Sequence, residues 1–281
     1  MKLCFLGTPE IAVTPLRGLV AAGHDIELVV TNADARRGRG KDASPSPVKA
    51  AALELGLRVS HDAADIADAA DVADVADSGA ELGIVVAYGH ILRPNVLDVM
   101  PFVNLHFSLL PRWRGAAPVE RAILAGDELT GVCVMAVEEG LDTGGVYASA
   151  TTAVGTKTLQ QLWSELSVTG TELLVDWLTT FTGRADLPTA EPQHGEVTHA
   201  AKLTAQDRRL DLAAPAHQQL AVIRLGNAWT EVGAKRLKVL DAQIDDQGAL
   251  RVLEVQPEGK RPMAFDQWSR GVPPEQRAIF G

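Results

Sequence analysis

The sequence has few cysteines and lacks any long hydrophobic run. Cys4 and Cys133 are the two cysteines among 281 residues, and each lies in an apolar stretch typical of a strand. This argues against a disulfide-stabilised secreted scaffold and predicts two buried, reduced thiols. No apolar run approaches the roughly 20 residues that cross a bilayer. The first residues resemble neither a signal peptide nor an Arg- and Ser-rich presequence, so we expect a cytoplasmic protein.

Several common functional motifs are also missing. Gly7 is a lone glycine after the first predicted strand, without the Gly-rich turn of dinucleotide-binding folds. Residues 38–42 lack the upstream glycine and the following Ser or Thr of a phosphate-binding P-loop. The seven histidines have no metal-binding spacing. Asp142-Thr143-Gly144 occurs once, whereas an aspartic protease needs two such carboxylates. We therefore expect no metal and no tightly bound cofactor.

The order of the predicted elements indicates an α/β fold. With 46% hydrophobic and 22% charged residues, the chain can bury a sizeable core. Apolar runs alternate with helical patterns over residues 1–183, which predicts a mostly parallel sheet with helices on both faces. Residues 182–196 are rich in Gly, Pro and Ala and show no periodicity, which predicts a linker over residues 184–199. Residues 200–281 predict a second, small β-rich domain.

Charge is distributed unevenly along the chain. The net charge of −10 argues against a general nucleic-acid coat. Residues 201–281, however, carry 12 lysines and arginines against 10 acidic residues, so the preceding 200 residues carry −12. Within that acidic part, residues 31–49 form a basic island, which is typical of a local phosphate contact and also of a solvated loop. Its basic residues are Arg36, Arg37, Arg39, Lys41 and Lys49.

Three polar side chains share one face of a predicted strand. Asn104, His106 and Ser108 alternate with apolar residues, and alternate residues of a strand point the same way. Asp142 follows a later predicted strand, and no Ser or Cys occupies an activated turn. An amide, an imidazole and a carboxylate suit direct acyl transfer between two amines, since His106 and Asn104 could stabilise the oxyanion. Asp142 could keep His106 protonated and relay protons, although a structural histidine satisfied by its neighbours is an equal alternative.

Longer strings of residues resemble a known family. Asn104-Leu105-His106-Phe107-Ser108-Leu109-Leu110-Pro111, followed by Gly140-Leu141-Asp142-Thr143-Gly144, resembles the formyltransferases that use 10-formyltetrahydrofolate. Two further strings, Ser44-Pro45-Ser46-Pro47-Val48-Lys49 and Arg112-Trp113-Arg114-Gly115-Ala116-Ala117-Pro118, resemble the branch of this family that formylates initiator methionyl-tRNA. The resemblance is close over residues 3–180 and looser beyond them.

The resemblance implies both a fold and a set of functional residues. It implies a Rossmann-like catalytic domain and a barrel-like (OB-like) C-terminal domain that binds tRNA. A formyl group would pass from 10-formyltetrahydrofolate, a co-substrate, to the α-amino group of initiator Met-tRNA, and Asn104, His106 and Asp142 would be catalytic. The implied folate-binding residues are Ala87, Tyr88, Gly89, Ser108, Leu109, Leu110 and Pro111. The implied tRNA-binding residues are Arg36, Arg37, Arg39 and Lys41, in a protein expected to be monomeric.

Two other interpretations remain at this point. A related formyltransferase that acts on an amino sugar nucleotide or another small amine would keep the three catalytic residues but would need no basic island. An RNA-binding protein that had lost activity would have no use for an intact trio. The chain also departs from the family, because Gly226-Asn227-Ala228-Trp229-Thr230 stands where an Asn-Pro-Trp-Pro stretch is usual. That departure concerns how tRNA would dock rather than the catalytic centre.

Overall fold

The chain divides into two compact units. The computed structural model describes residues 1–36, 43–60, 77–92, 94–183, 187–277 and 280. The first unit comprises Met1–Pro118, Thr130–Ala153 and Trp163–Ala200, and the second comprises Val119–Leu129, Val154–Leu162 and Ala201–Gly281. The second unit thus includes two short segments that lie within the catalytic domain predicted from the sequence.

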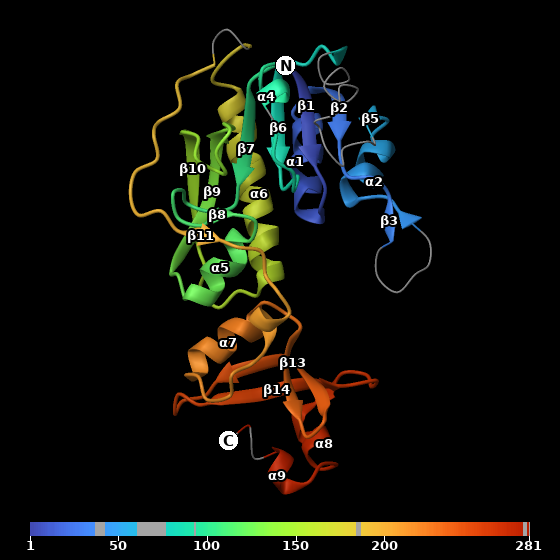
Figure 1. The fold of residues 1–281 in the computed structure, drawn as a ribbon, viewed down its shortest axis with the longest axis vertical. Helices are drawn as coiled ribbons and strands as arrows, with labels where there is room; N and C mark the ends of the chain where they lie inside the picture. The colour runs from blue at the N-terminus through green and yellow to red at the C-terminus, as the bar shows by residue number, and fades with distance from the viewer. Residues whose placement is uncertain (37–42, 61–76, 93, 184–186, 278–279, 281) are drawn as a thin grey trace. The chain divides into compact units, whose positions relative to one another are not determined.

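The first unit is built on a mostly parallel sheet (Figure 1). Within the described residues its seven strands, in spatial order, are β10 (Val146–Ala153), β9 (Leu129–Ala136), β7 (Phe102–His106), β6 (Leu82–Val86), β1 (Lys2–Gly7), β2 (Asp25–Val30) and β5 (Val59–Ser60). The pairs from β7 through β6, β1 and β2 to β5 are parallel, whereas β9 runs antiparallel to β7. The α/β fold predicted from the sequence is confirmed.

The strand order contains a point where the chain changes direction across the sheet. From β1 the chain proceeds outward to β2 and β5, and then returns to the other side of β1 to form β6 and β7. In open α/β sheets, ligands bind beyond the carboxyl ends of the strands at such a switch point. The segments that follow β1 and β6 are therefore the expected walls of a site, and Thr8 Oγ1 joins them by donating to the carbonyl of Tyr88 at 3.3 Å.

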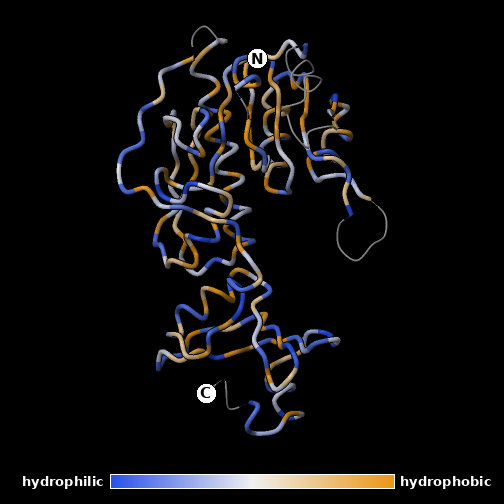
Figure 2. The backbone as a smooth tube through the Cα atoms, viewed as in Figure 1, coloured by the Kyte–Doolittle hydropathy of each residue, from blue (hydrophilic) through white to orange (hydrophobic). Residues whose placement is uncertain are grey.

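Apolar residues cover both faces of this sheet. Leu6 and Val85 lie on one face and pack with Val96 and Met100, in the segment between β6 and β7. Leu105 lies on the other face, where Gly170 of the long helix α6 (Leu159–Leu178) approaches it closely. Figure 2 shows hydrophobic residues concentrated along the central strands. Burial on both faces explains why these strands are nearly continuous apolar runs in the sequence.

The remaining helices and short strands of the first unit connect and cover the sheet. They are η1 (Glu10–Ala12), α1 (Val13–Ala21), β3 (Ala35–Arg36), β4 (Ala43–Ser44), α2 (Pro47–Glu54), α4 (Pro94–Leu97), β8 (Arg114–Gly115) and β11 (His199–Ala200). Helix α2 begins at Pro47, because proline suits a first helical turn and Ser46 Oγ accepts the backbone N–H of Lys49 at 2.9 Å. Strands β8 and β11 pair in parallel, which brings residues 114–115 beside residues 199–200.

The second unit contains a four-stranded antiparallel sheet in the order β12-β13-β14-β15. Its elements are α5 (Pro118–Ala125, from Val119 on), η3 (Gln206–Arg208), α7 (Ala216–Arg224), β12 (Ala228–Val232), β13 (Lys235–Ile244), β14 (Leu250–Pro257), β15 (Met263–Ala264), α8 (Phe265–Ser269) and α9 (Pro274–Arg277). The fully buried Val239 and Val255 pair directly across β13 and β14 and form the centre of its core. The predicted small β-rich domain is therefore confirmed in its strand content.

Candidate active site

The structure brings Asn104, His106 and Asp142 together. Strand β7 places Asn104 and His106 on the same face, as the sequence alternation predicts, and it ends at His106. Asp142 lies in the loop between β9 and β10. Its Oδ2 is 3.6 Å from His106 Nδ1, and its Oδ1 is 3.5 Å from Asn104 Nδ2. One carboxylate thus faces both the amide and the imidazole.

The second nitrogen of His106 is also engaged. Nε2 lies 3.0 Å from the carbonyl oxygen of Trp113. Because a carbonyl oxygen can only accept, Nε2 carries the hydrogen in this contact. The nitrogen directed at Asp142 is therefore Nδ1. With His106 only 5% exposed, the ring is held at both ends in a largely water-free position.

Backbone strain is concentrated around these residues. Ala87, Trp113 and Asp142 have φ values of 47°, 64° and 51°. This left-handed region is unfavourable for residues with a Cβ, and such outliers gather at functional sites. Trp113 presents the carbonyl that receives His106, and Asp142 is the carboxylate of the trio. The strained conformations therefore occur at the residues that direct the Trp113 carbonyl and the Asp142 carboxylate toward His106.

Gly115 fixes the carboxylate of Asp142 from another direction. Its backbone N–H donates to Asp142 Oδ2 at 2.7 Å. Gly115 has a φ of 122°, and a Cβ there would lie 2.8 Å from the carbonyl oxygen of Ala200. Only glycine fits both this conformation and this close approach.

Gln193 joins the two loops that carry the site, although it lies in the predicted linker. Its Oε1 accepts from Arg114 Nε at 3.0 Å and from Arg114 Nη2 at 2.7 Å. Its Nε2 donates to the carbonyl oxygens of Asp142 at 2.9 Å and Gly144 at 2.7 Å. Thr198 Oγ1 likewise accepts the backbone N–H of Trp113 at 2.9 Å. Sequence reasoning missed Gln193 and Thr198, because the composition of their segment signals only an irregular connection.

Two adjoining cavities open beside the trio. The larger, of about 400 Å³, is lined by Asn104, His106 and Asp142 together with residues that follow β1 and β6, at the switch point of the sheet. The smaller, of about 90 Å³, shares Asn104 and Asp142 with it and extends toward Glu138 and Glu139. A cavity of this size with a few converging polar groups is the usual form of a small-molecule site.

The residues expected to bind folate fall into two groups. Ala87, Tyr88 and Gly89 line the larger cavity beside the trio. Leu109 and Leu110 instead line a separate cavity of about 310 Å³ near β10. Ser108 is fully buried and donates to the carbonyl of Arg112 at 2.6 Å, so it holds the loop that leads to Trp113. Pro111 extends that loop, and its carbonyl accepts the backbone N–H of Thr198 at 3.4 Å.

The expected tRNA-binding residues are only partly within the described chain. Arg36 is exposed and ends the two-residue strand β3. Arg37, Arg39 and Lys41 lie outside the described residues. Their role remains a prediction from the sequence.

Neither cysteine is suited to act as a nucleophile. Burial raises the pKa of the Cys4 thiol to about 12. Burial also raises the pKa of Cys133, and the backbone near Leu110 opposes this only in part. Since the thiolate is the nucleophilic form, both thiols are inert near neutral pH. Within the described residues, no cluster of His, Cys, Asp and Glu could hold a metal ion, and no helix is long and apolar enough to cross a membrane.

Comparison with known proteins decides the family. Residues 1–178 match the sequence model of the family described as Formyl transferase. The chain belongs to the formyl transferase family. A methionyl-tRNA formyltransferase of Ruegeria pomeroyi is 39% identical over 301 residues, which cover 97% of this chain and 98% of that protein. The similarity to the Ruegeria pomeroyi protein therefore extends through both units of this chain.

Two solved structures of low sequence identity share the fold of this chain. The methionyl-tRNA formyltransferase from Clostridium thermocellum superposes with a TM-score of 0.62 at 14% identity, covering 92% of this chain and 98% of that chain. HypX from Aquifex aeolicus in complex with tetrahydrofolic acid gives a TM-score of 0.67 at 15% identity. That match covers 96% of this chain and 47% of HypX, so this chain corresponds to about half of HypX.

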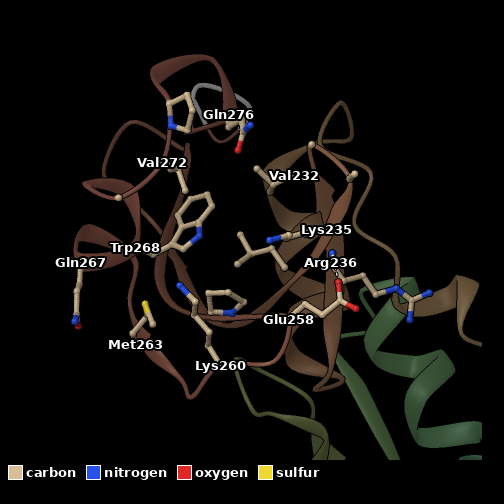
Figure 3. Close-up of a pocket in the computed structure, with 16 residues that line it drawn as sticks. Val232, Lys235, Arg236, Glu258, Lys260, Met263, Gln267, Trp268, Val272 and Gln276 are labelled. Atoms are coloured by element: carbon tan, nitrogen blue, oxygen red, sulfur yellow. Dashed lines mark hydrogen bonds between the residues drawn. The ribbon is translucent and has the colours of Figure 1, made fainter.

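A fourth cavity lies in the second unit, and none of the trio lines it. It has a volume of about 600 Å³ and is lined by residues between Val232 and Gln276. Figure 3 shows the Lys235 and Lys260 ammonium groups and the Trp268 indole turned toward the same space. The Arg236 guanidinium points away and lies 3.9 Å from the centre of the Trp229 ring. Basic groups beside aromatic side chains therefore characterise this cavity and its surroundings in the second unit.

Proposed function

We propose that this protein transfers a formyl group from 10-formyltetrahydrofolate to the α-amino group of initiator methionyl-tRNA. The product would supply formyl-methionyl-tRNA for translation initiation. The observation that carries the proposal is the convergence of Asn104, His106 and Asp142 at the edge of a cavity of about 400 Å³ in a chain of this family. Similarity to a methionyl-tRNA formyltransferase over 97% of the chain supports the choice of acceptor.

The three side chains suit a direct transfer between two nitrogens. The amino nitrogen of the methionyl group attacks the formyl carbon, and the carbonyl oxygen takes the negative charge. Asn104 Nδ2 and a protonated His106 Nδ1 can donate hydrogen bonds to that oxygen. The carbon–nitrogen bond to the folate then breaks, and one proton moves from the attacking amine to the leaving nitrogen. Asp142, which faces both donors, is the group that relays this proton.

Residues 1–183 are proposed as the catalytic domain, 184–199 as the linker and 200–281 as the tRNA-binding domain. The basic cavity of the second unit supports the last assignment, because phosphates are bound mainly through lysines and arginines. Trp229 adds an aromatic surface close to two guanidinium groups, with Arg236 at 3.9 Å and Arg209 at 5.5 Å from its ring centre. Such surfaces suit contact with RNA backbone and exposed bases.

A competition assay tests the proposal. Purified protein is given 10-formyltetrahydrofolate and either charged initiator tRNA, charged elongator tRNA or an amino sugar nucleotide, and formylated product is measured. We expect product with initiator methionyl-tRNA and background levels with the amino sugar nucleotide. Formylation of the amino sugar nucleotide in preference to tRNA would establish the alternative acceptor. Arg39→Ala is expected to weaken use of tRNA while leaving folate binding intact.

A further inference from the structure

His90 lies at the junction of the two cavities beside the trio. It follows β6 in the segment that begins with Ala87, and it lines both the larger and the smaller cavity. Asn104 and Asp142 are also shared between these cavities, so His90 faces the same space as two of the proposed catalytic residues. Its ring is partly buried and packs against Tyr88, with the ring centres 5.1 Å apart. The catalytic chemistry proposed above makes no use of it.

A single hydrogen bond sets the orientation of this imidazole. His90 Nε2 lies 2.7 Å from Asn32 Oδ1, in the segment that follows β2. An amide oxygen can only accept, so Nε2 carries the hydrogen and Nδ1 of the neutral ring is left as an acceptor. Nδ1 makes no hydrogen bond to any residue that the structure describes. His90, which lines both cavities, thus carries an acceptor nitrogen in the tautomer that Asn32 selects.

The segment that carries Asn32 is itself firmly held. Thr31 Oγ1 and Ser46 Oγ are 2.7 Å apart in a buried contact. Asp34 pairs with Lys49 at 2.7 Å. The Asn32 amide is therefore anchored on both sides along the chain, and the hydrogen bond joins the ends of β2 and β6 across the end of β1. An anchored partner lowers the entropy lost when the imidazole is ordered.

We propose that His90, oriented by Asn32, is a specificity-determining residue for the formyl donor. Its Nδ1 accepts a hydrogen bond from an N–H group of the amino-substituted heterocycle of the folate. This inference rests on the proposed use of a folate, and it adds a side-chain contact next to Ala87, Tyr88 and Gly89, which line the same cavity.

Binding of tetrahydrofolate to the full-length protein, measured by calorimetry, tests the pair without requiring turnover. His90→Ala and Asn32→Ala should each weaken binding about tenfold, the effect of losing one well-placed hydrogen bond. The double variant should be no weaker than either single variant, because both changes remove the same contact. His90→Gln restores an amide donor and an acceptor oxygen, and should bind within about threefold of the unaltered protein.

His24→Ala is the matched control. His24 is also partly buried, but it immediately precedes β2. It therefore lies at the amino end of that strand, whereas Asn32 follows the carboxyl end. It should leave the dissociation constant unchanged. Unchanged binding in His90→Ala, or additive losses in the double variant, would overturn the inference and leave the proposed function standing. Failure of the unaltered protein to bind tetrahydrofolate would overturn both.

Discussion

The proposed active site in the first unit and the basic cavity in the second hold their polar groups in opposite ways. His106 is 5% exposed and contacts a partner at each ring nitrogen, while backbone N–H groups and Gln193 fix the loops around it. Lys235 and Lys260, by contrast, are exposed side chains, the first at the start of β13 and the second in the turn region after β14. Stabilising a transient charge requires fixed donors in a water-poor site, whereas attracting a polyanion requires only a concentration of like charges.

Removing the imidazole of His106 should cause the largest loss of activity. His106→Ala should lower kcat by about 10²- to 10⁴-fold, the range for a group that acts in acid–base or oxyanion chemistry, with a smaller change in the KM for tRNA. Asp142→Ala should have an effect of the same order. Steady-state formylation kinetics measure both. Near-normal turnover in either variant would show that the trio is structural.

The clamp formed by Gln193 should matter next. Gln193→Ala removes the hydrogen bonds that tie Asp142 and Gly144 to Arg114, and a displaced carboxylate can cost up to about 100-fold in rate. We expect kcat to fall while the KM for both substrates and the thermal unfolding midpoint change little. Gln160→Ala, an exposed position on α6, is the matched control. An equal loss of kcat in both variants would contradict the positioning role.

Changes in the second unit should alter the KM for tRNA and its dependence on salt concentration, and should leave kcat nearly unchanged. Replacing Lys235 and Lys260 together by Ala should raise the KM for tRNA and leave kcat nearly unchanged. The slope of log KM against log salt concentration should fall by about 2, since each phosphate contact contributes roughly 1. Measurements at several salt concentrations give that slope. If it is unaltered, RNA binds elsewhere.

The smallest expected effect concerns the stability of the second unit at low pH. Hydrogen bonds from the Thr204 side chain and backbone, assisted by Arg121, lower the pKa of Asp207 to about 2 from its ordinary value of 3.8. A lowered pKa contributes stability that is complete above the unfolded value and is lost as the pH falls toward 2. Asp207→Asn should therefore cost about 1 kcal/mol or less at pH 7, with a difference that shrinks below pH 4. Urea unfolding across that range measures it.

The sequence predicted those parts of the site that depend on the local secondary structure. Alternation along residues 103–107 placed Asn104 and His106 on one face because a strand has a period of two. The same reasoning extended the strand to Ser108, whereas β7 ends at His106 and Ser108 instead secures the following loop. The start of α2 also follows from a local signal, because Pro47 stands at its first position after the capping residue Ser46.

The rest depends on contacts between distant segments. The four hydrogen bonds of Gln193 reach residues about 50 to 80 positions away, and nothing in a Pro- and Gly-containing stretch announces them. Strand β10 has no clear signal in the sequence, because its residues are mostly small, half-buried or exposed and lack a strong apolar period. The positive φ of Ala87 and Trp113 is likewise imposed by packing and not by residue type.

The position of Gln193 sets the smallest piece of this chain that could work alone. The family match ends at residue 178, yet the amide that secures Asp142 lies at 193 and the hydroxyl that secures Trp113 lies at 198. A fragment trimmed to the matched region would retain the proposed catalytic residues and lose the hydrogen bonds that hold Asp142 and Trp113 in place. A chimera that joins the proposed catalytic domain to another module should therefore carry this chain through Ala200, where β11 pairs with β8.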